Sequence, residues 1–217
     1  MTTRYFGAPI ARNEDRRLLT GRALFVNDVE RPGMLHVAFL RSPHAHARLG
    51  AVELSRVRER PGVVAAYAAD DLGDYWKPGP LLVPPPPIEG AIFHQQTQVP
   101  LARGKVRHVG EPVALVVAES RYMAEDALAE IGVEYQPLPA VTDLERALAP
   151  DSAQVHEGVA GNVAARVHQK KGDYEAARQA AAVVLRRRFR YERGCSAPIE
   201  TRGVVADWDA KAERLTV

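Results

Sequence analysis

Short apolar runs, separated by turn-forming residues, open the chain. We expect strands at 23–26, 34–41 and 47–54, because Asn, Asp, Pro or Gly lie between these runs. Ser55 is a suitable N-cap, so a short helix is expected to follow the third strand. The fully apolar run 63–68 predicts a further strand in the interior.

The clearest periodic unit lies near the middle of the chain. Residues 112–118 form a continuous apolar run that predicts a buried strand. Ser120 is the expected N-cap of a helix that ends near Glu130, and 131–135 has the pattern of another strand. This strand–helix–strand order is compatible with a βαβ connection.

A proline-rich segment interrupts the pattern between Lys77 and Pro100. It contains seven prolines, which leave few free amide donors and favour extended geometry. We interpret it as a long loop. Because it carries apolar residues such as Leu81, Ile88 and Phe93, we expect it to lie against a surface, either of its own domain or of a partner.

The last third of the chain predicts a second region. A domain boundary is expected between about 138 and 165, where prolines flank a short helix at 143–148. Asp173 and Glu175 lie at the expected start of a helix that ends near Ala182, where their charges suit the helix dipole.

Three further strands are predicted near the end of the sequence, at 185–191, 202–208 and 213–217. In the first of them Leu185 and Phe189 share one face, and arginines occupy the other. The last two form a hairpin. Since the final run is apolar and lacks a cap, we expect another segment to continue this sheet.

Composition narrows the class of protein. The 217 residues are 46% hydrophobic and 26% charged with a formal net charge of +2, which fits a soluble folded protein and excludes a basic tail that binds nucleic acid. No secretory signal and no apolar run of about 20 residues is present, so a cytoplasmic protein without a membrane span is expected. The single cysteine, Cys195, excludes an internal disulfide and a self-contained iron–sulfur cluster.

Two histidine motifs have spacings that suit chemistry. His44 and His46 would point to the same side of an extended segment, as metal ligands do, but a structural or interface role is the alternative. His108 and Glu111 suggest a general base, whereas Gly110 and Pro112 around them indicate a turn that leads into a strand.

The C-terminal region offers a thiol and a group of cations. Cys195 lies beside Arg193, which would lower a thiol pKa, but no histidine is close in sequence. The arginines at 186, 187, 188, 190 and 193 suggest phosphate binding or a solvated strand face, and the near-neutral chain favours the latter. No dinucleotide-binding, Walker, nucleophile-elbow or HExxH motif occurs, so the motifs provide no catalytic site.

Several segments together resemble the molybdenum hydroxylase large subunits, the family of xanthine dehydrogenase, aldehyde oxidase and aerobic carbon monoxide dehydrogenase. The segments similar to the N-terminal α/β hammerhead domain of that family are 13–15, 18–21, 25–28, 39–48, 61–64, 109–114, 116–120, 124–127 and 133–141. Those that resemble the opening of its molybdopterin-binding region are Gly172–Asp173, Ala197–Gly203 and Ala206–Trp208. The resemblance covers nearly the whole chain in order.

The resemblance implies an α+β fold and a domain plan. It places an N-terminal extension at 1–17, a hammerhead domain with a mixed sheet at 18–140 and a connector at 141–165. An incomplete molybdopterin-binding domain, with its first helix and strands, follows at 166–217. The proline-rich loop 77–100 is then part of the hammerhead domain.

The resemblance also implies a function for the whole enzyme. Family members use a molybdopterin, often the cytosine dinucleotide form in bacteria, to hydroxylate aldehydes or N-heterocycles or to oxidise carbon monoxide. Iron–sulfur clusters and FAD on other subunits or domains carry the electrons away. The family's cofactor and base residues lie beyond Val217, so no catalytic, cofactor-binding or metal residue is carried over onto this chain. Glu200 and Arg202 match the family pattern without an assigned role.

The expected partners are the remaining molybdopterin-binding polypeptide, an iron–sulfur subunit and a flavin subunit. In that reading the chain is the first part, natural or truncated, of a large subunit, and it acts as a scaffold and docking surface. The alternative is a non-catalytic interaction module that retains the hammerhead fold. Nucleic-acid binding through the arginines ranks last, since it would require a steep dependence of affinity on salt.

Overall fold

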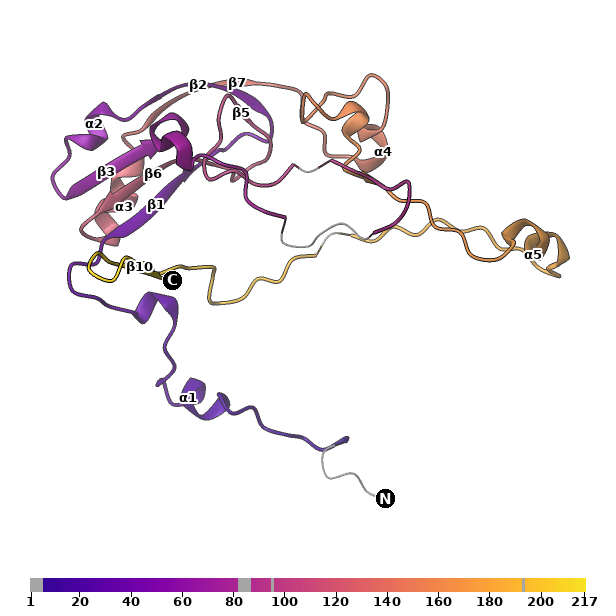
Figure 1. Cartoon of the computed structure of the whole chain (residues 1–217), viewed down its shortest axis with the longest axis horizontal. Coiled ribbons are helices and arrows are strands. Elements are labelled where there is room, and N and C mark those ends of the chain that lie inside the picture. The colour runs from indigo at the N-terminus through magenta and orange to yellow at the C-terminus, as the bar shows by residue number, and fades with distance from the viewer. Residues whose placement is uncertain (1–5, 82–86, 95, 193) are drawn as a thin grey trace. The chain divides into compact units, whose positions relative to one another are not determined.

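The computed structural model describes residues 6–81, 87–94, 96–192 and 194–217 (Figure 1). The chain divides into two compact units. One runs from Leu35 to Ala182, and the other combines the N-terminal segment up to Met34 with the C-terminal segment from Val183. None of the helices in these described residues is long and apolar enough to cross a membrane.

The larger unit contains most of the secondary structure. Its strands are β1 (His36–Arg41), β2 (Ala47–Glu53), β3 (Val63–Ala68), β4 (Ile92–Phe93), β5 (Lys105–Val106), β6 (Pro112–Ala118), β7 (Gly132–Pro137) and β8 (Ala165–Arg166). Its helices are α2 (Ser55–Arg58), α3 (Arg121–Leu128), α4 (Leu144–Ala147) and α5 (Tyr174–Ala180), with 3₁₀ turns η2 (Ala69–Tyr75) and η3 (Ala160–Asn162).

The strands of this unit form small antiparallel sheets. One has the order β1-β6-β3 and another the order β5-β2-β7, while β4 pairs with β8. In the first sheet Leu115 of β6 lies opposite Phe39 of β1 and Tyr67 of β3, so these three side chains share one face. The opposite face of the sheet is covered by α2 and α3. The expected α+β class is confirmed.

Two hydrophobic cores meet at β6. Ala114 and Val116 pack with residues of α2, α3 and the β2–α2 junction in the first core. Val113 packs in the second core against Ala47 of β2 and Val106 of β5. Because successive residues of a strand point to opposite sides, one continuous apolar strand supplies both cores.

Helix α3 forms where the sequence predicts it. The Ser120 side chain accepts a hydrogen bond from the Met123 amide at 3.2 Å, which caps the helix, and Ala124 and Ala127 form its buried face. Gly62 lies against this helix with φ +82°. A Cβ on Gly62 would come within 2.5 Å of the Met123 sulfur, which a flexible methionine can move, so it is the positive φ that favours glycine here.

Most predicted elements are present. Strands at 36–41, 47–53, 63–68 and 112–118 are confirmed, as are helices capped by Asp143 and Asp173. The residues that flank the proline-rich loop meet on the larger unit, since the Trp76 indole donates to the Leu101 carbonyl at 2.8 Å. Residues 82–86 and 95 of that loop lie outside the described residues.

Several predictions about the larger unit are wrong. Ser55 lies inside α2, and Leu54 is its N-cap residue, so the serine makes no cap. The strand at 63–68 is at the edge of its sheet, and only Ala66 in it is fully buried. Strands β6 and β7 belong to different sheets, so they do not form a parallel βαβ unit. Local periodicity does not specify which strands become neighbours.

The smaller unit has little regular structure. It contains α1 (Asp15–Leu19), the 3₁₀ turn η1 (Val26–Asp28) and the antiparallel hairpin of β9 (Asp207–Asp209) and β10 (Arg214–Thr216). The predicted hairpin is therefore confirmed, with shorter strands. The strands predicted at 23–26 and 185–191 are wrong, because the described residues of the second range are exposed and hydrogen-bond to no neighbouring strand.

Truncation in β6 tests the shared core. We expect Val116→Ala to lower the free energy of unfolding of the 217-residue chain by about 2 kcal/mol, because two buried methyl groups are lost and a cavity remains. Val64→Ala in β3 is the control, since that side chain is 57% exposed, and it should cost less than about 1 kcal/mol. Urea denaturation measures both. Equal losses in the two variants would contradict this description of the core.

Candidate functional site

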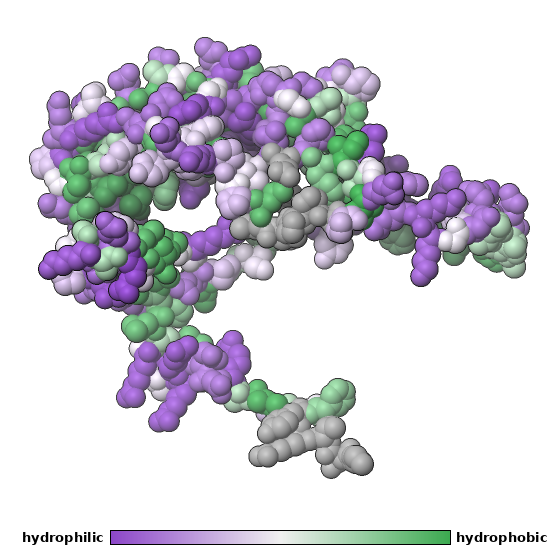
Figure 2. Space-filling view, in the orientation of Figure 1, coloured by the Kyte–Doolittle hydropathy of each residue, from purple (hydrophilic) through white to green (hydrophobic). Residues whose placement is uncertain are grey.

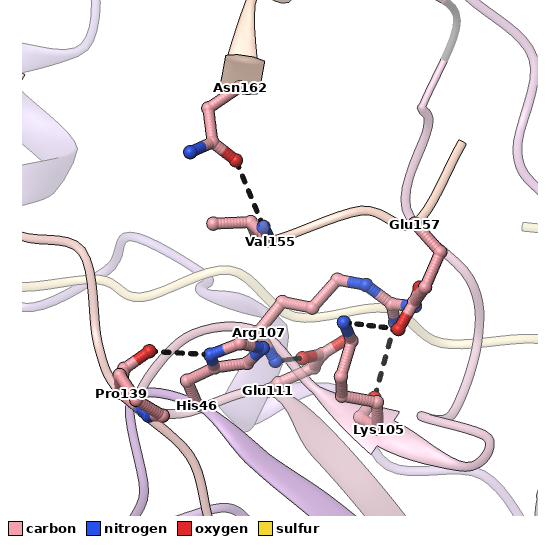
Figure 3. A network of polar contacts seen from close by, with 8 residues as sticks. All are labelled: His46, Lys105, Arg107, Glu111, Pro139, Val155, Glu157 and Asn162. Carbon is pink, nitrogen blue, oxygen red and sulfur yellow. Dashed lines mark hydrogen bonds and ion pairs between the residues drawn. The ribbon is translucent and has the colours of Figure 1, made fainter. Parts of the chain in front are cut away.

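A cluster of polar side chains lies where β2, β5 and the loop before η3 meet (Figure 3). His46 precedes β2 and is only 7% exposed, and its Nδ1 lies 2.7 Å from the Pro139 carbonyl oxygen. Glu111, which precedes β6, is also buried, and its carboxylate accepts a hydrogen bond from the Arg107 amide. His46 thereby joins segments that are 93 residues apart, whereas Glu111 fixes the local turn that leads into β6.

An ion-pair network covers this cluster. The Lys105 ammonium, whose side chain is 7% exposed, lies 2.5 Å from one carboxylate oxygen of Glu157. The Arg107 guanidinium lies 3.7 Å from the other oxygen. The hydrogen bond from Lys105, helped by the charges of Lys105 and Arg107, lowers the pKa of Glu157 from its ordinary 4.5 to about 2. Glu157 is therefore ionised throughout the neutral range.

His156 sits beside this network in a different electrostatic state. Burial lowers its pKa below the ordinary 6.5, and the neighbouring charges of Arg107 and Lys105 lower it further. The carboxylates of Glu157 and Glu111 raise this pKa, but by less than burial and the two cations lower it. At neutral pH the imidazole is therefore uncharged.

A pocket of about 310 Å³ lies next to His156. Its lining residues are His94, Gln96, Val155, His156, Val159, Asn162 and Ala164. The Asn162 side chain accepts from the Val155 amide at 2.9 Å and donates to the carbonyls of Ala147 and Ala153. All these bonds fix the loop that forms one wall, so Asn162 serves the structure of the pocket.

The charges in this cluster are balanced. Lys105 and Arg107 are matched by Glu157 and Glu111. No group of three His, Cys, Asp or Glu side chains that could hold a metal ion occurs among the residues that the structure describes. The arrangement is suited to fastening one segment on another rather than to acid–base or metal chemistry.

The two histidine motifs of the sequence end in separate environments. The His44 ring packs on Tyr135, with 4.8 Å between the ring centroids, while His46 binds the Pro139 carbonyl. His108 and Glu111 do approach, at 3.7 Å, but the Glu111 carboxylate already holds the Arg107 amide. These contacts favour the structural alternative for both motifs.

The C-terminal candidates lie on the surface. Cys195 is exposed, and Arg193 beside it lies outside the described residues. The arginines at 186, 187, 188 and 190 are exposed as well, and Arg190 pairs with Glu192 at 2.6 Å. The structure brings no base to the thiol among the residues it describes, so nothing in these contacts activates it as a nucleophile.

Glu200 has a contact that the sequence did not suggest. Its carboxylate accepts a hydrogen bond from the Val26 amide at 3.0 Å, across 174 residues of sequence. Gly203 approaches the same residue, because a Cβ there would lie 2.7 Å from a Val26 methyl group. Two sequence motifs from opposite ends of the chain are thus held together in the smaller unit, and only the family resemblance pointed to them.

Comparison with protein families decides the assignment. Residues 20–139 match the model of the aldehyde oxidase and xanthine dehydrogenase a/b hammerhead domain, and residues 155–217 match that of the molybdopterin cofactor-binding domain. The chain belongs to the aldehyde oxidase and xanthine dehydrogenase family. The resemblance based on short motifs is therefore confirmed.

Curated relatives support the same family. The chain is 37% identical over 220 residues to the nicotine 6-hydroxylase large subunit of Paenarthrobacter nicotinovorans, covering 99% of this chain and 26% of that protein. It is 36% identical over 224 residues to the carbon monoxide dehydrogenase large chain of Afipia carboxidovorans, covering 97% and 26%. The chain thus spans about a quarter of the length of these relatives.

Solved structures agree. Quinoline 2-oxidoreductase from Pseudomonas putida 86 superposes with a TM-score of 0.82 at 40% identity, over 95% of this chain and 25% of that one. The aldehyde oxidoreductase of Desulfovibrio gigas superposes with a TM-score of 0.64 at 26% identity, over 79% of this chain and 19% of the other. The chain therefore shares its fold with part of a molybdenum hydroxylase large subunit.

The residues of this chain do not by themselves fit a molybdopterin. From Val183 onward nearly all the described side chains are exposed, and the pocket described above lies in the larger unit. The nearby cations Lys105 and Arg107 are paired with Glu157, so their charge is not free to bind a phosphate there. No step of cofactor chemistry is therefore assigned to these residues.

Removal of the Glu157 charge should weaken the fold in a pH-dependent manner. Because the folded-state pKa is lowered, the contribution of Glu157 is complete above pH 4.5 and is lost as the pH falls toward 2. We expect Glu157→Gln to reduce stability at pH 7 by about 1 kcal/mol, since the carboxylate is largely exposed. The gap between variant and wild type should close as the pH falls through that range.

Chemical denaturation at several pH values measures this gap. Glu125→Gln on α3 is the matched control, because it removes the same charge from an exposed helix position. A deficit in Glu157→Gln that stays constant down to pH 2 would rule out the ion pair as its source.

Proposed function

We propose that this chain forms the N-terminal part, or a split subunit, of a molybdenum-dependent hydroxylase or dehydrogenase. It provides the hammerhead scaffold on which the rest of the molybdopterin-binding part and an iron–sulfur partner assemble. The observation that carries the proposal is the ordered match of both family models along the chain.

The proposed whole enzyme contains a molybdopterin, with the cytosine dinucleotide form expected, and passes electrons through iron–sulfur clusters to FAD on partner subunits or domains. When bound, the molybdenum group supplies oxidative hydroxylation of aldehydes or N-heterocycles, or oxidation of carbon monoxide. Relatives that act on nicotine and on carbon monoxide are similarly close to this chain, so the substrate class stays open across this range. The proposed location is the cytoplasm.

An exposed apolar sheet face supports the docking role. Phe39 and Tyr67 flank Leu115 on the side of the β1-β6-β3 sheet that α2 and α3 leave open, and they are 41% and 37% exposed. Val37, on the same face, is 52% exposed. Adjacent apolar side chains of this size on an open sheet face are typical of an interface, and the proposed occupant is the remaining molybdopterin-binding polypeptide.

The alternative function is a non-catalytic interaction module that has kept the hammerhead fold. The balanced charges of the polar cluster and the exposed sheet face would also suit such a module. Its partner would contain no molybdenum. The two candidates therefore differ in a single measurable quantity.

Metal analysis of the native assembly separates them. We expect the chain, isolated under native conditions from its host, to elute in a complex much larger than 23.8 kDa that contains stoichiometric molybdenum and iron. The purified chain alone is the control and should carry neither metal. A metal-free species, alone or with a partner, would contradict the enzymatic proposal and favour the interaction module.

A charge on the sheet face tests the docking surface. We expect Phe39→Asp to reduce recovery of the complex by tenfold or more, about 1.4 kcal/mol, because burial of an unpaired carboxylate is costly. Tyr122→Asp is the control, since Tyr122 is 77% exposed on α3, away from that face. Thermal unfolding confirms that both variants fold. Equal recovery of the two complexes would eliminate this face as the interface.

A further inference from the structure

The segment from Ala153 to Arg166, which we name the strap, lies on the larger unit instead of running free. Its last residues pair with β4, where Ile92 lies opposite Arg166. The His94 amide donates to the Ala164 carbonyl at 2.9 Å, and Asn162 ties the strap together internally. The strap is thus held at its C-terminal end by backbone hydrogen bonds.

The middle of the strap is fastened differently. Glu157 is the strap residue that pairs with Lys105 and Arg107 of the underlying unit. Lys105 is nearly buried, so displacement of Glu157 would leave its ammonium without its counter-charge. The attachment of the strap therefore depends on the charge balance at this point.

His156 is next to Glu157 in the sequence, and its imidazole titrates close to these balanced charges. The charged groups around it are Lys105, Arg107, Glu157 and Glu111, and His94 lines the same pocket. A proton on His156 would add a third cation beside Lys105 and Arg107 in a partly buried place. The repulsion is relieved when the strap lifts and the imidazole becomes solvated.

We propose that the strap is an acid-sensitive latch, closed at neutral pH by the ion pairs of Glu157 with Lys105 and Arg107 and released when His156 is protonated. Residues 155–217 match the molybdopterin-binding model, so the latch lies at the start of that match, within the larger unit. Its release would loosen the attachment of the following region without unfolding the sheet beneath.

The direction of the pH effect follows from the lowered pKa of His156. The closed state binds a proton less readily than the open state, so its stability relative to the open state is complete above pH 6.5 and falls as the pH decreases below that value. Glu157 does not contribute in this window, because its carboxyl has an ordinary pKa of 4.5 and a lower one when closed. Between pH 7 and 5 the strap should therefore respond to His156.

Hydrogen exchange in the 217-residue chain tests the latch. The reporters are the amide of His94, whose hydrogen bond to the Ala164 carbonyl requires a seated strap, and the amides of the β4–β8 pair. After correction for intrinsic exchange, we expect their protection to fall by about threefold or more from pH 7 to pH 5. Amides of β6 should keep their protection, because the core stays folded.

Two variants make the assignment specific. His156→Gln should remove the pH dependence of the reporters, whereas His94→Gln, which changes the other imidazole of the pocket, should retain it. The proposal is overturned if strap protection does not change with pH, if it changes in parallel with β6, or if it changes equally in His156→Gln.

A direct titration keeps the test decisive if His156→Gln loosens the strap at every pH. Nuclear magnetic resonance of the wild-type chain follows the His156 ring carbon protons and the His94 amide together. Coincident midpoints for the ring titration and for the loss of amide protection support the latch. Midpoints that differ by more than about one pH unit contradict it.

Discussion

Strand β6 is the element on which the larger unit depends. It is hydrogen-bonded on both edges, to β1 and β3, and its side chains enter two separate cores. Val113 serves one core while Ala114 and Val116 serve the other. All seven residues of β6 are buried or half-buried and none is exposed, which explains its continuous apolar sequence.

The same constraint places the polar cluster. Just before β6 the chain turns at Gly110. Its φ of +85° and the hydrogen bond from its amide to the Ser42 carbonyl fix the turn. Glu111 follows at the last position before the strand enters the core, where its buried carboxylate can still bind the Arg107 amide. Lys105 and Arg107 are thereby presented toward the strap, so the latch chemistry depends on how β6 begins.

Sequence patterns predicted those elements that local chemistry determines. The Ser120, Asp143 and Asp173 caps each accept a backbone hydrogen bond at the start of their helix.

Patterns failed where the outcome depends on distant partners. Residues 185–191 alternate as a strand should, yet no strand pairs with them among the described residues, and nothing in local periodicity provides one. The Glu200–Val26 contact spans 174 residues and was likewise beyond prediction, although both motifs had been singled out. The strap network was missed because Glu157, Lys105 and Arg107 belong to no recognised motif.

The limits of a family match and the limits of a folded unit differ in this chain. The molybdopterin-binding match begins at residue 155, whereas the larger compact unit continues to Ala182 and includes the strap. Figure 2 shows mainly hydrophilic side chains along the segment that carries α5, beyond the strap, so that segment gains little from apolar burial. The first residues of the match are instead anchored by Glu157 and by the β4–β8 pair. An ionic anchor near buried cations responds to protonation, while an apolar core does not, and this difference makes the junction, rather than the sheet, the adjustable part of the molecule.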